Sequence, residues 1–283
     1  MSLGIAIATL SAYENTLKRR VQFWKGDFIE PIPKWYGDRG VFGGGYDGSS
    51  FLNVIDYITI STLGNAQDFG DLVIARSNAT GVSDGSRGCF GGGYDYDASA
   101  VQNVIDYITI STLGNAQDFG DLTVGRLHLA GASNGSRGCF GGGGTAWGGG
   151  SSFNVIDYIT ISTLGNASDF GDLTVVRDVM GGCFGDSDRG VFGSGYDGSS
   201  FLNVIDYITI STLGNASDFG DLTVVREYLG GVSNGTRGCF GGGKNSSGDT
   251  NIIDYITIST LGNAQDFGDL TTARRTLAGL SGD

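Results

Sequence analysis

The sequence predicts an all-β fold, a five-bladed β-propeller of four-stranded antiparallel blades, and three observations support this prediction. First, NVIDYITISTLGNAQDFGDL recurs with few changes at 53–72, 103–122, 154–173, 203–222 and 251–270. Second, the aspartate of each IDY lies 48 to 51 residues from that of the neighbouring copy. Third, each unit holds four segments of β-branched and aromatic residues separated by Gly and Asn turns. Repeats of this length with four short strands are typical of propeller blades.

Composition excludes several classes of partner. The chain has 283 residues, 52 glycines and a formal net charge of −13. The glycines recur in register with apolar segments, so they mark turns and not a disordered, low-complexity chain. The negative charge opposes binding to nucleic acid and to anionic membrane surfaces. No apolar run approaches the roughly 20 residues of a bilayer span, so we expect no membrane insertion.

Residues 1–37 precede the repeats and form a separate leader. Apolar residues at helical spacing predict an amphipathic helix over 8–24. The segment is basic in an otherwise acidic chain, and Pro31 and Pro33 prevent further helix. Two interpretations stay open: the leader docks to a partner, or it packs as a flap on the propeller of 38–283.

Each repeat is expected to contribute its strands in a fixed order. In the first copy, the apolar strand RGVFGGG (39–45) ends at glycines, and a variable loop follows it. The longer strand NVIDYITIS (53–61) leads to a Leu-Gly-Asn turn (63–65), because Gly and Asn tolerate positive φ. A third strand begins in DFGDL, and a fourth, SNATGVS (77–83), leads to an Asp-Gly turn typical of hairpins.

The two ends of the repeat array are complementary. The last copy stops at Asp283, nine residues after Arg274 and just inside its hairpin turn, and the first copy starts at Asp38, at the next position of the same register. We therefore expect the C-terminal strand to pair with the N-terminal strands, placing Asp283 beside Asp38 and closing a ring of five blades.

The order of residues within each unit resembles the kelch repeat. In the first copy the matching residues are Gly43-Gly44, Tyr57, Phe69, Leu72 and Arg76. The unit departs from the usual pattern in having Phe where kelch has Trp, and a longer segment between Tyr57 and Phe69. The copies also resemble, in the style of their DYITI…DFGDL motif, repeats of tail-fibre and virion structural proteins of tailed phages, notably those of cyanobacteria.

The second resemblance implies a non-enzymatic virion structural or adhesion protein, a tail fibre or spike that binds a host-surface receptor such as a glycan. It further implies that the protein is made in the host cytoplasm and is located on the virion. Residues 1–37 would contact other virion subunits, and the resemblance is compatible with a homo-oligomer. The alternative is a lectin-like carbohydrate-binding module of cellular origin, in which repeated weak sites give avidity.

Charged residues that recur once per blade are expected to form structural ion pairs, because a buried carboxylate needs a charged partner. The aspartates are Asp56, Asp106, Asp157, Asp206 and Asp254. The candidate arginines are Arg39, Arg87, Arg137, Arg189 and Arg237, and Arg76, Arg126, Arg177, Arg226 and Arg274. The alternative, a Ca²⁺ site at Asp68 and Asp71, is disfavoured because their spacing does not match a calcium-binding loop, and no metal is expected.

The residues do not predict catalysis. Near-identical units give near-identical carboxylate environments, whereas a glycosidase needs two unlike ones. The single histidine, His128, cannot complete a repeated triad, and no cofactor motif is present. All four cysteines occupy positions that are apolar in sister copies, so we expect free core thiols.

The loops that follow the GGG segments are the predicted binding surface. They differ between copies, while the LGNA turns hardly change. Tyrosine, tryptophan, aspartate and asparagine in glycine-rich loops suit sugar recognition. The alternative is that these loop residues differ between copies only by neutral sequence drift. The candidate ligand-binding residues are Tyr46, Asp47, Tyr94, Tyr96, Trp147, Tyr196, Asp197 and Asn245.

Overall fold

A computed structural model describes residues 38–145, 151–178, 183–185 and 188–277. The chain divides into two compact units, Met1–Lys34 and Trp35–Asp283. The helix expected over 8–24 lies outside the described residues. Within the described part of the chain, no helix has the length and apolar character that a membrane span needs.

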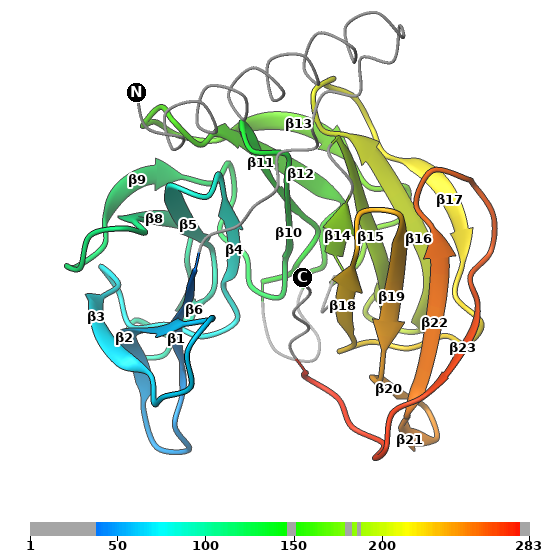
Figure 1. Cartoon of the computed structure of the whole chain (residues 1–283). Coiled ribbons are helices and arrows are strands. Elements are labelled where there is room, and N and C mark those ends of the chain that lie inside the picture. Colours follow the sequence, from blue (N-terminus) through cyan, green and yellow to red (C-terminus); the bar gives the residue numbers. More distant parts are fainter. Residues whose placement is uncertain (1–37, 146–150, 179–182, 186–187, 278–283) are drawn as a thin grey trace, which may run out of the picture. The chain divides into compact units, whose positions relative to one another are not determined.

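The second unit is a five-bladed β-propeller, which confirms the predicted fold (Figure 1). Blade 1 contains β1 (Arg39–Tyr46), β2 (Phe51–Thr59) and β3 (Gln67–Asp71). Blade 2 contains β4 (Thr80–Ser83), β5 (Arg87–Gly91), β8 (Val104–Thr109) and β9 (Gln117–Asp121). Blade 3 contains β10 (Ala130–Ser133), β11 (Arg137–Gly141), β12 (Val155–Thr160) and β13 (Ser168–Asp172).

Blade 4 contains β14 (Cys183–Gly185), β15 (Arg189–Tyr196), β16 (Phe201–Thr209) and β17 (Ser217–Asp221). Blade 5 contains β18 (Gly230–Ser233), β19 (Arg237–Gly241), β22 (Ile252–Thr257) and β23 (Gln265–Asp269). Two short ribbons, β6 (Tyr94–Asp95) with β7 (Ala100–Val101) and β20 (Lys244–Asn245) with β21 (Gly248–Asp249), extend the loops after GGG. The strand expected to complete blade 1 falls largely on 278–283, outside the described residues.

In blades 1 to 4, a β-bulge in the DFGD strand contacts the next blade. In blade 3, Ile156 pairs with Gly171 but Asp157 pairs with Asp169, so Phe170 is the extra residue and its side chain is buried. Gly171 has φ of 144°, and a Cβ there would lie 2.5 Å from the backbone oxygen of Gly214 in blade 4. Only glycine allows this close approach. The approach lets Gly214 N donate to Phe170 O at 2.9 Å.

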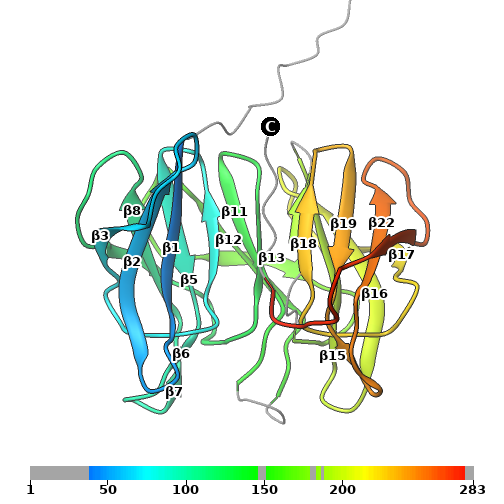
Figure 2. The ribbon, with the colours of Figure 1, turned by 60° about the horizontal axis from the view of Figure 1, so that its bottom comes forward.

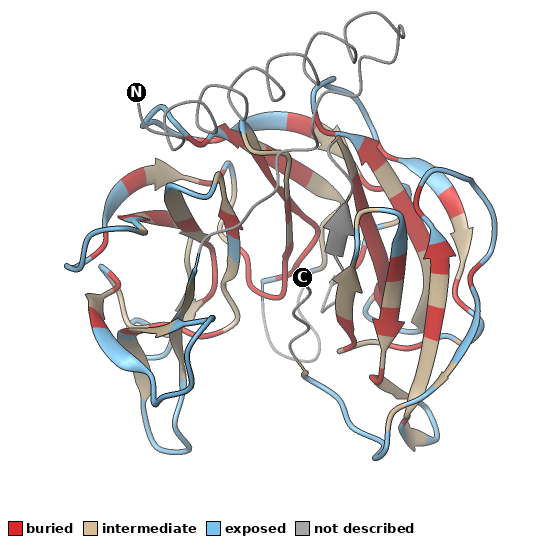
Figure 3. Cartoon of the chain, viewed as in Figure 1, coloured by how far each residue is buried: buried red, intermediate tan, exposed pale blue. Residues whose placement is uncertain are grey.

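The hydrophobic core lies between the blades, as Figure 3 shows by its buried segments on facing strands. One cluster combines Cys139 and Phe170 of blade 3 with Phe192 and Ile208 of blade 4. In blades 1 to 4, the glycine after the phenylalanine of the first apolar strand makes room for the phenylalanine of the following blade: a Cβ on Gly141 would lie 2.8 Å from the Phe192 ring. Side-chain volume in one blade therefore depends on a glycine in its neighbour.

The described residues of blades 5 and 1 do not make these contacts with each other. Phe267 of blade 5 is 53% exposed, whereas its equivalent Phe219 is 2% exposed. Phe42 of blade 1 is 49% exposed, whereas its equivalent Phe192 is fully buried. A Cβ on Gly268 would meet no atom within 4 Å. The expected position of Asp283 beside Asp38 lies outside the described residues.

Candidate functional site

The buried aspartates and the second arginine of each unit form ion pairs between neighbouring blades. The nitrogen–oxygen distances are 2.8 Å for Arg76–Asp106, 3.0 Å for Arg126–Asp157, and 2.9 Å for both Arg177–Asp206 and Arg226–Asp254. All eight side chains are fully buried. Burial lowers the pKa of Arg126, Arg177 and Arg226, and the paired aspartates oppose that shift. These groups neutralise one another inside the fold, and their burial keeps them from any ligand.

The first arginine of each unit does not join these pairs, which corrects the expectation that both series pair with the aspartates. The Arg87 guanidinium lies 4.6 Å from the centre of the Tyr107 ring and donates to Ile161 O of the next blade at 2.7 Å. Arg137 stacks on Tyr158 and donates to Ile210 O in the same way. A half-buried guanidinium gains both a cation–π contact and a carbonyl acceptor here, so it needs no carboxylate.

The loops after GGG and the connections that follow the second arginine lie at one end of the blades. Isolated backbone bridges join them: Ser77 with Tyr94, Leu127 with Gly144, Asp178 with Tyr196, and Glu227 with Lys244. The ribbon β6–β7 marks this end in Figure 2, and the ribbon β20–β21 is labelled in Figure 1. The LGNA turns lie at the opposite end, because each long central strand runs from one to the other. We call the first end the loop face.

Four aromatic residues form a continuous cluster on the loop face across blades 1 and 2. The Phe51 ring stacks on Tyr96 with centroids 5.4 Å apart and planes 9° apart. Tyr46 lies 5.0 Å from Phe51 on one side, and Tyr94 lies 6.2 Å from it on the other. Tyr46 and Tyr96 are 56% and 63% exposed. The structure thus brings together three of the predicted binding residues around Phe51, and we call the four residues the aromatic cluster.

Sequence reasoning missed Phe51, although a signal for it existed. Blade 4 repeats YDGSSF, and there Tyr196 lies 5.5 Å from Phe201, with no ring contact to the loop after GGG of blade 5 among the described residues. The phenylalanine that ends this loop therefore accompanies the tyrosine that begins it. Trp147, the remaining predicted aromatic, lies outside the described residues.

The predicted polar residues of the loops shape the turns themselves. Asp47 Oδ1 accepts hydrogen bonds from Ser49 N at 2.8 Å and Ser50 N at 2.7 Å, and these bonds lower the pKa of Asp47. Asp197 repeats this arrangement with Ser199 and Ser200. Asn245 Oδ1 accepts from Ser247 N at 2.8 Å. These are Asx turns, which leave each aspartate its second carboxylate oxygen for a ligand.

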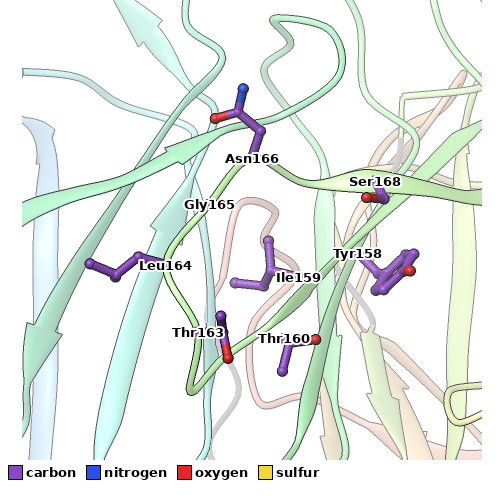
Figure 4. Close-up of a pocket in the computed structure, with 8 residues that line it drawn as sticks. All are labelled: Tyr158, Ile159, Thr160, Thr163, Leu164, Gly165, Asn166 and Ser168. Atoms are coloured by element: carbon purple, nitrogen blue, oxygen red, sulfur yellow. The ribbon is translucent and has the colours of Figure 1, made fainter.

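A shallow pocket of about 230 Å³ lies at the opposite end of blade 3 (Figure 4). Its lining includes Tyr158, Leu164, Asn166 and Ser168. In blade 2 the tyrosine hydroxyl donates to the Gln117 side chain at 2.6 Å. Blade 3 has the smaller Ser168 at the position of Gln117, so we attribute the pocket to this replacement and not to a built site.

No group of three or more His, Cys, Asp or Glu side chains suited to a metal ion occurs in the described ranges. Asp68 and Asp71 are therefore not part of such a group. The expectation that the protein lacks catalytic activity stays a prediction.

No model of a known protein family matches the chain, and a search of curated protein sequences finds no match either. The propeller architecture therefore rests on the repeats and on the structure.

Proposed function

We propose that this protein is a non-enzymatic adhesion protein that binds a glycan through its loop face, as part of a phage tail fibre or spike. The observation that carries the proposal is the aromatic cluster, in which two tyrosines more than half exposed flank Phe51 across two blades. Exposed aromatic rings bind the apolar faces of sugars and keep a polar group for the hydroxyls. The kelch-like order of residues and the phage-like motif style support the same assignment.

The surrounding loops suit this role. The Asx turns at Asp47 and Asp197 hold two neighbouring serines each, so hydroxyl and carboxylate oxygens line the loops beside the tyrosines. Among the described residues, each of the four fully buried carboxylates contacts an arginine, so these acids neutralise a charge inside the fold. Binding without turnover is the activity that these residues support best.

The virion role extends to residues 1–37, which we propose dock the propeller to other virion subunits after synthesis in the host cytoplasm. A lectin-like module of cellular origin would share the loop face. Co-purification separates the two proposals: the phage assignment expects residues 1–37 to be protected by a particle subunit.

A glycan array probed with the full chain tests the binding proposal. We expect retention of at least one glycan without its hydrolysis, and about tenfold or greater loss of affinity in the double variant Tyr46→Ala/Tyr96→Ala. The matched control is Leu113→Ala/Leu213→Ala, which removes two exposed apolar side chains from the LGNA turns, at the end opposite the loop face. Equal binding by both double variants and the wild type would refute the loop-face assignment, and release of cleaved sugar would refute the non-enzymatic one.

A further inference from the structure

A second variable region lies where the chain crosses from one blade to the next. The two residues directly after the second arginine differ in all five copies: Ser77-Asn78, Leu127-His128, Asp178-Val179, Glu227-Tyr228 and Arg275-Thr276. The arginine before them is present in every copy. The two positions thus hold different residues in every copy, directly beside a residue that does not change.

The propeller gathers these positions around its axis. They precede the first strand of each blade, and β4, β10, β14 and β18 neighbour one another at the centre (Figure 1). His128 N donates to Asn78 O at 3.3 Å, and Thr276 N donates to Tyr228 O at 2.8 Å. The His128 and Tyr228 rings lie 6.2 Å apart in an edge-to-face arrangement. We call Asn78, His128, Asp178, Glu227 and Tyr228 the axial cluster.

The backbone of this cluster has an unusual conformation. Asn78, His128 and Tyr228 have φ of 57°, 61° and 58°, the left-handed region that favours glycine. A bulky tyrosine in this region is rare, and such residues concentrate at ligand sites. Thr276 has φ of 55°, so four described residues at this position share the conformation although they differ in type.

The largely buried carboxylate of Asp178 lies beside His128 in this cluster. Its Oδ2 lies 3.9 Å from His128 Nδ1, and its Oδ1 is buried without a hydrogen-bond donor among the described residues. The next copy has Tyr196 at the position of Gly144, where a Cβ would collide with Asp178 Oδ1. Gly144 therefore makes room for this carboxylate. Burial raises the pKa of Glu227; the charge of Asp178 adds to this effect, and the charges of Lys244 and Arg275 oppose it.

We propose that the axial cluster binds one uncharged, hydroxyl-rich sugar residue, a site that rests on the proposed glycan-binding function. The Glu227 carboxylate and Oδ2 of Asp178 accept hydrogen bonds from sugar hydroxyls. Tyr228 offers a ring face and His128 a further polar group. The same two carboxylates repel uronic acids and sulfated sugars, and Lys244 and Arg275 near Glu227 are the charges that oppose this selectivity.

The single histidine of the chain makes the site directly observable. We would titrate the full chain with the methyl glycosides of glucose, galactose, mannose and N-acetylglucosamine, and follow the His128 ring protons by NMR. Methyl glucuronide serves as the charged control. We expect at least one neutral glycoside to shift the His128 signals and the glucuronide to leave them unchanged.

The sister copies supply the variants. Asp178→Ser and Tyr228→Asn introduce the residue types that the first copy has at the equivalent positions, Ser77 and Asn78. Asn78 has nearly the same φ as Tyr228, so we expect both variants to fold. Each should weaken the binding of the glycoside about tenfold or more. The loop-face variant Tyr46→Ala/Tyr96→Ala should leave the His128 shift intact.

Two results would overturn the axial site: no neutral glycoside shifts His128, or the shift survives both axial variants. If the first occurs while the loop-face variant loses array binding, the proposed function stands alone. If His128 shifts but the loop-face variant keeps full array binding, the axial site stands and the loop-face assignment falls.

Discussion

At the scale of single residues, the repeats place the same side chain in different surroundings. Cys89, Cys139 and Cys239 share the motif RGCFGGG and are free thiols. Cys89 and Cys139 are buried, and burial raises the pKa of each thiol to about 12. Cys239 is only partly buried, because no further blade covers its face among the described residues.

We therefore expect iodoacetamide at pH 8 to label Cys239 sooner than Cys89 or Cys139 in the native protein, since only the thiolate reacts. Peptide mass spectrometry over time measures the three rates, and labelling in urea provides the reference in which all three react. Equal native rates would contradict the difference in burial, and a mass change on reduction would contradict the free thiols.

At the scale of the element, one substitution changes how two paired strands are held. The tyrosine of IDY donates to glutamine across the strand pair at 2.6 Å in blades 1, 2 and 5. Blades 3 and 4 have Ser168 and Ser217 in place of that glutamine. The pocket beside Tyr158 lies on this strand pair (Figure 4).

Ser168→Gln should restore the hydrogen bond and fill part of the pocket, raising the free energy of unfolding by about 0.5–1 kcal/mol. The reciprocal change, Gln117→Ser in blade 2, should lower it by a similar amount. Urea-induced unfolding followed by circular dichroism measures both. A loss of stability in Ser168→Gln would show that blade 3 does not accommodate the longer side chain.

At the scale of the whole propeller, four junctions share one set of contacts, and the described residues of blades 5 and 1 lack it. Asp157 pairs with Arg126 and also accepts from the Thr123 hydroxyl. Asp56 occupies the same position in blade 1, yet it forms no ion pair among the described residues and is only partly buried. Its counterpart Arg274 is exposed.

Asp157→Ala should therefore lower the free energy of unfolding by about 3–5 kcal/mol, because it leaves Arg126 buried without a counter-charge. Asp56→Ala is the matched control and should cost about 0.5 kcal/mol or less, as at an exposed site. Urea unfolding compares the two variants. Equal large losses would mean that Arg274 and Asp56 pair in solution and that the ring is closed by the same junction as the rest.

The sequence by itself determined the blade. The repeat period, the Gly and Asn turns and the alternation of apolar residues specify strands that pair with their sequence neighbours, and such local pairing follows from turn geometry and register. It also identified Asp106 and its equivalents as buried acids, because a carboxylate inside an apolar strand needs a partner. The residues of the loop face were also predicted from the sequence, because they vary between otherwise similar copies.

Only the tertiary structure decided which residues meet between blades. Both arginines of a unit were equal candidates for the aspartate, and the stacking of one blade on the next brings Arg76 to Asp106 while Arg87 lies over Tyr107. Phe51 joins Tyr96 across a blade boundary, and His128 meets Tyr228 two blades away. These contacts depend on how twisted sheets pack face to face, a geometry that no spacing within a single repeat encodes.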